Sequence, residues 1–84
     1  MMDLSQHADE KVRRAYDFVR RSGQWGERVI AFYEQYEARH YDTRDSLAAY
    51  IKSSYSVLYT QGEAELIATY LLACREVEQV IARL

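Results

Sequence analysis

The chain contains no proline and only three glycines in 84 residues. An interior proline costs a helix about 3 kcal/mol and an interior glycine about 1 kcal/mol relative to alanine, so their scarcity favours long helices joined by short turns. Hydrophobic residues make up 49% of the sequence and charged residues 29%, which is the balance of a globular domain. We therefore expect residues 1–84 to form a single all-α domain, a compact bundle of about four helices whose C-terminal helix is the longest.

Cysteine and long apolar runs are also scarce. The single cysteine, Cys74, cannot form an internal disulfide, which suits a reducing compartment. The first residues lack the basic and apolar regions of a secretory signal. The apolar runs are far shorter than the roughly 20 residues that cross a bilayer. These absences predict a cytoplasmic protein that does not contact a membrane.

Neither sign of charge dominates, and recognisable site chemistry is missing. The net charge of −2 fits neither a general polyanion binder nor an acidic mimic of nucleic acid. His7 and His40 are isolated, no histidines or cysteines have metal-ligand spacing, and there is no glycine-rich phosphate loop. The carboxylates are interleaved with arginines, so none stands out for acid–base chemistry. We expect no catalytic site, no metal and no cofactor.

Apolar residues recur at spacings of three and four in four segments, which is the period of an amphipathic helix. They predict helices from Ser5 to Ser22, from Trp25 to about Arg39, from Thr43 through residue 59, and from Gln61 to about Arg83. Residues 55–59 are aromatic and β-branched enough to be extended instead, and we interpret them as helical. Gly23 is a natural terminator for the first helix.

Capping residues mark three of the predicted helix starts. Asp3 or Ser5 can cap the first helix, and Asp42 or Thr43 can cap the third. Thr60 is followed three residues later by a glutamate, which is the spacing of a capping box at the start of the last helix.

The last predicted helix has more apolar surface than one neighbour can cover. Its main seam has the 3-4 spacing of a heptad repeat, and three further residues widen it. The seam residues are Ile67, Tyr70, Cys74, Val77, Ile81 and Leu84, widened by Leu66, Leu71 and Val80. Cys74 is therefore interpreted as a packing residue. We expect this helix to be central or to form a homodimer contact.

Eight tyrosines are an unusual number for so short a chain. Five of them fall on apolar stripes and are expected in the core: Tyr16, Tyr33, Tyr36, Tyr50 and Tyr70. Tyr41, Tyr55 and Tyr59 fit no stripe, and Leu72 falls on the far side of the last helix among charged residues. Tyrosine is enriched at protein interfaces, so these four are candidates for binding a partner protein, with ordinary surface placement as the alternative.

A basic strip on the first helix supports a second hypothesis. It consists of Lys11, Arg13, Arg14, Arg20 and Arg21, with Trp25 close by in the sequence. Such a strip can bind phosphate groups or an acidic partner, and a nearby tryptophan can stack on a base. The alternative is a solvated face with internal ion pairs, because Glu10 and Asp17 lie within the strip.

The stretch from Trp25 to Leu72 resembles the helical part of ArdA-type antirestriction proteins. In that family an apolar helix precedes an alanine-containing helix and a Tyr-x-Gly-x-Tyr-x-Ser segment. The comparable residues here are 29–32, Ala49 and 55–60, with Val57 in place of the central glycine. That family inhibits restriction enzymes through charge mimicry of DNA, which needs far more negative charge than −2. The resemblance implies membership of the wider class of small mobile-element proteins that block host defence.

The leading functional hypothesis is a non-catalytic protein-interaction module, of the kind that a phage or plasmid uses to occlude a host defence protein. A homodimer through the last helix fits the surplus apolar surface. The alternative is a protein that binds nucleic acid or a nucleotide through the basic strip.

Overall fold

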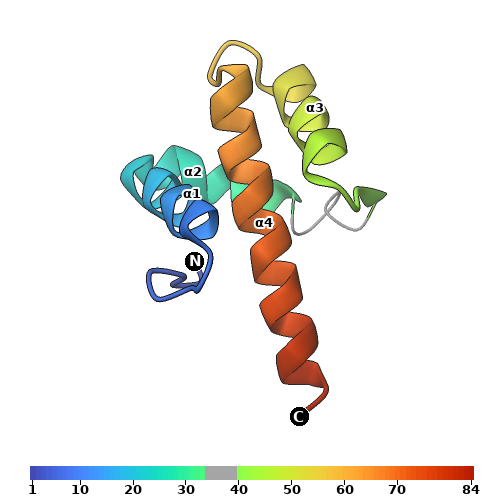
Figure 1. The fold of residues 1–84 in the computed structure, drawn as a ribbon. Helices are drawn as coiled ribbons and strands as arrows, with labels where there is room; N and C mark the ends of the chain where they lie inside the picture. Colours follow the sequence, from blue (N-terminus) through green and yellow to red (C-terminus); the bar gives the residue numbers. More distant parts are fainter. Residues whose placement is uncertain (34–39) are drawn as a thin grey trace.

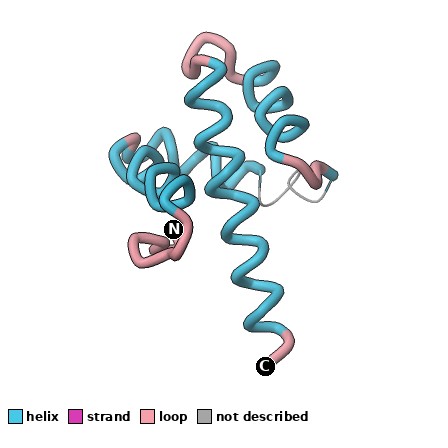
Figure 2. Tube along the Cα trace, viewed as in Figure 1, coloured by secondary structure: helices cyan, strands magenta, loops and turns pink. Residues whose placement is uncertain are grey.

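A computed structural model of the chain describes residues 1–33 and 40–84. The described part contains four α-helices and no β-strand, which confirms the predicted all-α class (Figures 1 and 2). The helices are α1 (Glu10–Arg21), α2 (Gly23–Phe32), α3 (Arg44–Ser54) and α4 (Gln61–Ala82). The last helix is the longest, as predicted, with 22 residues.

Helix α4 is the central element of the bundle. The N-terminal half of α4 packs against α1 on one side and α3 on the other, and α2 packs against α1 (Figure 1). The C-terminal half of α4 extends beyond the other three helices, so the molecule is elongated, at 40 × 25 × 21 Å. The bundle therefore encloses one half of α4 and leaves the other half projecting.

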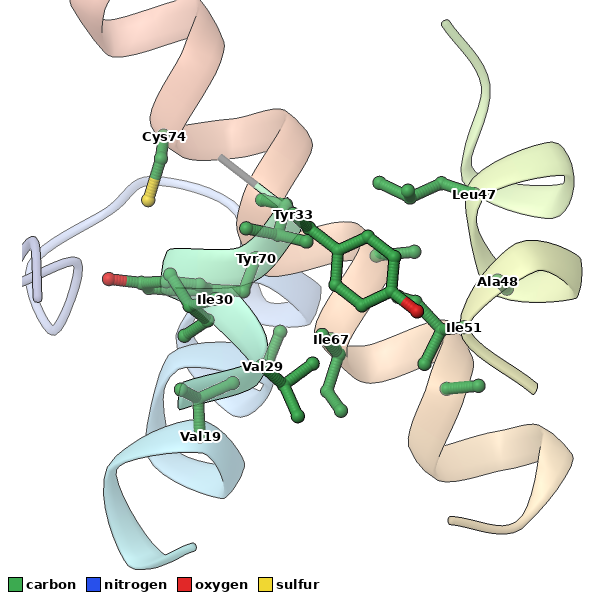
Figure 3. Packing of buried hydrophobic residues seen from close by; sticks show 14 of the residues in the cluster. Val19, Val29, Ile30, Tyr33, Leu47, Ala48, Ile51, Ile67, Tyr70 and Cys74 are labelled. Atoms are coloured by element: carbon green, nitrogen blue, oxygen red, sulfur yellow. The ribbon is translucent and has the colours of Figure 1, made fainter. Parts of the chain in front are cut away.

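The hydrophobic core lies where the four helices meet around the first half of α4. The ring of Tyr33, which directly follows α2, points toward Leu47 and Ile51 of α3 (Figure 3). Full burial of one large aliphatic or aromatic side chain stabilises a fold by about 1.5–3 kcal/mol. The largest fully buried side chains are Val19, Val29, Tyr33, Leu47, Ile51, Ile67 and Tyr70.

Helix α1 begins later than the sequence predicts. Its N-cap is Asp9, whose Oδ1 accepts a hydrogen bond from the Lys11 backbone N–H at 2.9 Å. The predicted start at Ser5, with Asp3 or Ser5 as the cap, is wrong. Asp3 instead accepts from the Ser5 backbone N–H at 2.9 Å, which stabilises a local turn and competes with helix formation.

The segment before α1 is a loop fixed to the bundle by two side chains. The Arg13 guanidinium donates to the backbone carbonyls of His7 at 2.6 Å and Ala8 at 3.0 Å. Tyr70 of α4 donates its hydroxyl proton to the Met2 carbonyl oxygen at 2.6 Å. The N-terminal residues consequently lie against α4, close to the point where that helix leaves the bundle.

Helices α1 and α2 form a tight helical hairpin. Gly23 has a φ of +61°, the left-handed conformation expected of a helix-terminating glycine. Helix α2 begins at this glycine, two residues before the predicted start at Trp25. Gly26 is buried where the two helices are closest. The predicted continuation toward Arg39, and the core role predicted for Tyr36, lie outside the described residues.

Helix α3 ends at Ser54, so the helical interpretation of residues 55–59 is wrong. Tyr55 has φ −130° and ψ 38°, and the chain turns through residues 55–60. The Lys52 ammonium donates to the Tyr59 carbonyl oxygen at 2.7 Å, which closes this turn against the end of α3. A side-chain donor thus satisfies the Tyr59 carbonyl oxygen, which lies in the turn outside any helix.

The caps of the last two helices follow the sequence. Thr43 is the N-cap of α3 and accepts from the Ser46 backbone N–H at 3.2 Å. Thr60 and Glu63 form the predicted capping box, with hydrogen bonds of 3.2 Å and 2.9 Å in the two directions. Such reciprocal bonds satisfy backbone donors that a helix start otherwise leaves without partners.

Candidate interaction surface on the last helix

The heptad seam of α4 is buried in one half and exposed in the other. Ile67, Tyr70 and Cys74 are buried in the core, which confirms the packing role predicted for the cysteine. Further along, Val77 is half-buried and packs against the core. The last residues of the seam and its flank are then solvent-exposed: Val80 (58%), Ile81 (60%) and Leu84 (99%). One continuous apolar pattern is therefore buried in the core at its start and exposed to solvent at its end.

The apolar positions beyond Cys74, which we call the α4 stripe, are Val77, Val80, Ile81 and Leu84; Val77 is half-buried and the other three are exposed. These positions have the i, i+3, i+4, i+7 spacing of one helix face, and Leu84 lies just past the end of α4, whose C-cap is Arg83. A helix rises about 1.5 Å per residue, so the stripe extends about 10 Å along the axis. Helices α1 and α3 end before they reach this part of α4 (Figure 1).

Charged residues border the α4 stripe. Glu76, Glu78 and Arg83 are exposed. Among the described residues none of the three forms an ion pair within the chain. Glu76 and Arg83 are seven residues apart, two helical turns, and therefore lie on the same side of the stripe. The border thus carries both signs of charge with no intramolecular neutralisation.

A shallow groove opens beside the base of the projecting half. It has a volume of about 410 Å³ and is formed by the N-terminal loop, α2 and α4. Its lining residues are Met1, Met2, Glu27, Ile30, Ala31, Cys74 and Glu78. The groove meets α4 at Cys74 and Glu78, beside the start of the α4 stripe. The sequence offers no sign of it, because it exists only after residues 1–9 fold back onto α4.

The three tyrosines proposed as partner contacts lie closer to the core than the sequence suggests. Tyr59 is only 7% exposed, so its predicted surface placement is wrong. Tyr41 and Tyr55 are half-buried and pack against the core. The Tyr41 ring lies 4.9 Å from that of Tyr50, and the Tyr55 ring lies 6.0 Å from that of Tyr33. These tyrosines belong to the loops around α3, whose packing a helical stripe cannot predict.

Leu72 is also drawn into the bundle. It is half-buried and packs against the core, so its predicted position on a charged far side is wrong. On the same helix the Arg75 guanidinium donates to the Tyr41 carbonyl oxygen at 3.0 Å. The chain before α3 therefore covers a second side of α4, and a leucine outside the main seam still finds apolar neighbours.

The basic strip of α1 is partly neutralised within the helix, by two carboxylates. Arg14 pairs with Glu10 at 2.8 Å, while Arg20 and Arg21 both pair with Asp17, at 2.7 Å and 3.1 Å. The hydrogen bond from Arg20 lowers the pKa of the Asp17 carboxyl below its ordinary value, and the charge of Arg21 lowers it further. These pairs favour the interpretation of the strip as a solvated face.

The remaining members of the phosphate-binding hypothesis do not form one array. Arg13 is turned toward the N-terminal loop, where it donates to two carbonyls. Trp25 on α2 is 57% exposed. The Arg28 guanidinium lies 5.3 Å from the centre of the Trp25 ring, a cation–π distance, and covers part of the face on which a base would stack.

The described residues provide neither a metal site nor a membrane-spanning helix. Residues 1–33 and 40–84 hold no cluster of three or more acidic, histidine or cysteine side chains suited to a metal ion. No helix in these two ranges combines the length and the apolar character that crossing a bilayer requires.

Comparison of the chain with protein-family models, with curated proteins and with solved structures finds no match. The resemblance to ArdA-type proteins stays a prediction from the residues quoted for it. The segment compared with the Tyr-x-Gly-x-Tyr motif is the turn at residues 55–60 that joins α3 to α4.

Proposed function

We propose that this chain is a non-catalytic protein-interaction module that binds its partner through the α4 stripe. One observation carries the proposal: Val80 and Ile81 extend the apolar face of α4 and Leu84 follows at the helix end, yet all three are 58–99% exposed where α4 projects from the bundle. Scattered single apolar residues on a surface are ordinary, but neighbouring ones on one helix face characterise interaction sites.

The energetics of the projecting segment support this function. Burying apolar surface stabilises a complex by about 25 cal/mol per Å² before the costs of association. An isolated helix shorter than about 12–15 residues is marginally stable in water. The last two turns of α4 have few tertiary contacts of their own, so a partner that covers the stripe would also stabilise the helix.

Occlusion of another protein is one way in which such a module acts. The resemblance to ArdA-type proteins implies an inhibitor of host defence, and an inhibitor of that kind would use the same exposed helix face. The proposal requires no catalytic residue, metal or cofactor.

Photo-crosslinking tests the surface directly. A benzoylphenylalanine placed at position 81 in the full chain, expressed in cells of its source, should form covalent adducts with a bound protein. The matched control is the same residue at position 53, since Ser53 is exposed on α3, away from the stripe. We expect adducts at position 81 well above those at position 53. Equal or absent adducts at position 81 would reject the α4 stripe as a binding surface.

A further inference from the structure

We infer that the partner of the α4 stripe is a second copy of this chain, packed as an antiparallel helix pair. The inference rests on the proposed function and names its partner. It rests on the order of apolar and charged residues along the projecting half of α4. When two copies of this segment run antiparallel, apolar residues face apolar residues and opposite charges face each other.

The apolar residues match across a two-fold axis. When two α4 helices run antiparallel with Val80 opposite the partner's Ile81, Val77 falls opposite the partner's Leu84. Each stripe residue then has an apolar counterpart, and both copies use the same surface, as a two-fold interface requires. The side chains are all aliphatic and three of the four are β-branched, which suits the interlocking packing of coiled helices.

The charged border selects the antiparallel direction. In an antiparallel pair the same side of each helix faces the same side of its partner, so Glu76 comes close to the partner's Arg83. The two-fold axis repeats this contact at the other end of the pair, where Arg83 comes close to the partner's Glu76. A parallel pair would instead bring Glu76 toward the side that carries the partner's Glu78. Opposite charges at such flanking positions set the partner and the orientation of paired helices.

The groove at the base of α4 extends the same interface. In the antiparallel arrangement the end of the partner's α4 lies opposite Val77 and points toward Cys74, where the groove begins. Met1 is 54% exposed there, and Met2 and Ile30 line the groove beside it. A stable dimer buries roughly 1,200–2,000 Å² in total, more than two short helix stripes supply. The groove adds contact surface beside the stripe, more polar than apolar, with Met1 as its exposed apolar side chain.

The first test measures self-association. Sedimentation equilibrium over a wide concentration range should give a concentration-dependent monomer–dimer equilibrium for the wild-type chain. Ile81→Asp should shift the chain to monomer, because the charge would be buried between two apolar stripes. Val57→Asp is the matched control: Val57 is 97% exposed in the loop before α4, and its variant should dimerise like the wild type. Far-UV circular dichroism verifies that both variants stay folded.

The second test measures orientation. Glu76→Arg and Arg83→Glu should each weaken the dimer, by roughly two- to tenfold in dissociation constant, since each places like charges together at both ends of the pair. An equimolar mixture of the two variants should recover wild-type association as a heterodimer. Only the antiparallel pair makes both contacts complementary in that mixture, so recovery supports the arrangement and failure to recover overturns it.

The outcomes also separate the two proposals. A wild-type chain that stays monomeric at all concentrations, but forms adducts with other proteins at position 81, overturns the second-copy inference and leaves the interaction surface standing. A monomer without adducts at position 81 overturns both. If Ile81→Asp does not weaken the dimer, the α4 stripe is not part of the dimer contact and the second-copy inference is overturned.

Discussion

Replacing Gly26 by alanine should destabilise the protein, although alanine is the better helix former. A Cβ atom at this position would lie 2.9 Å from the Ser22 Cβ and 2.9 Å from the Val19 carbonyl oxygen. Neither atom is the free end of a flexible side chain, so relief requires α1 and α2 to move apart. Because both helices contribute to one core, that movement would loosen the packing around Val19 and Val29.

The magnitude follows from two opposing effects. Alanine gains about 1 kcal/mol over glycine in a helix interior. Overpacking a close contact costs about 1–3 kcal/mol, and two contacts with nearly immobile atoms place Gly26→Ala at the upper end. The net expected loss is about 2 kcal/mol in the free energy of unfolding. In a domain of this size each lost kcal/mol lowers the melting temperature by about 4–8 °C.

Gly62→Ala is the matched control for this substitution. Gly62 lies in the first turn of α4, and a Cβ atom added there meets no heavy atom within 4 Å. Only the propensity gain remains, so this variant should be more stable than the wild type by about 0.5–1 kcal/mol. Urea unfolding followed by far-UV circular dichroism measures both. A Gly26→Ala variant as stable as the Gly62→Ala variant would refute the close approach of α1 and α2.

Three further predictions concern single side chains. Thr60→Ala should lower the free energy of unfolding by about 1 kcal/mol because the capping box is lost, whereas Thr60→Ser keeps a hydroxyl cap and most of the stability. Urea unfolding of the two variants measures the difference. Tyr70→Phe leaves the Met2 carbonyl oxygen without its side-chain donor and should cost about 1 kcal/mol, with faster amide exchange in residues 1–9 as the second readout. Burial raises the pKa of Tyr33 to about 12, so the unfolded state loses its proton first and stability should fall as the pH rises from about 10 to 12. Tyr33→Phe should reduce that fall in unfolding midpoint, and an unchanged pH profile would contradict it.

The helices and two of their starts could be predicted because the signals are local. A helix places apolar residues at spacings of three and four on one side, where they can be buried together whatever element packs against them. Thr43 and Thr60 cap α3 and α4 through hydrogen bonds that span only three residues. The same reasoning placed Tyr70 and Cys74 in the core, since both lie on the centre of the α4 seam.

Helical spacing failed as a signal where side-chain hydrogen bonds or packing of a loop favour a turn. Residues 55–59 carry apolar side chains at helical spacing, yet Lys52 binds the Tyr59 carbonyl oxygen and the chain turns. Ser5 is a residue type that caps helices, but Asp3 and Ser5 form a local turn and α1 begins only after Asp9. Tyr59 fits no stripe and is nonetheless buried, because the loop that carries it folds back onto the core.

The sequence by itself determined that this chain is a small helical bundle with a long, unusually apolar last helix. It could not determine how far along that helix the bundle extends. Only the tertiary structure decided that the seam is covered up to Cys74 and exposed at Val80, Ile81 and Leu84. The periodic pattern is the same in both halves; the difference depends on where α1 and α3 end in space and on how the N-terminal loop folds back. The candidate surface is therefore a property of the packed bundle.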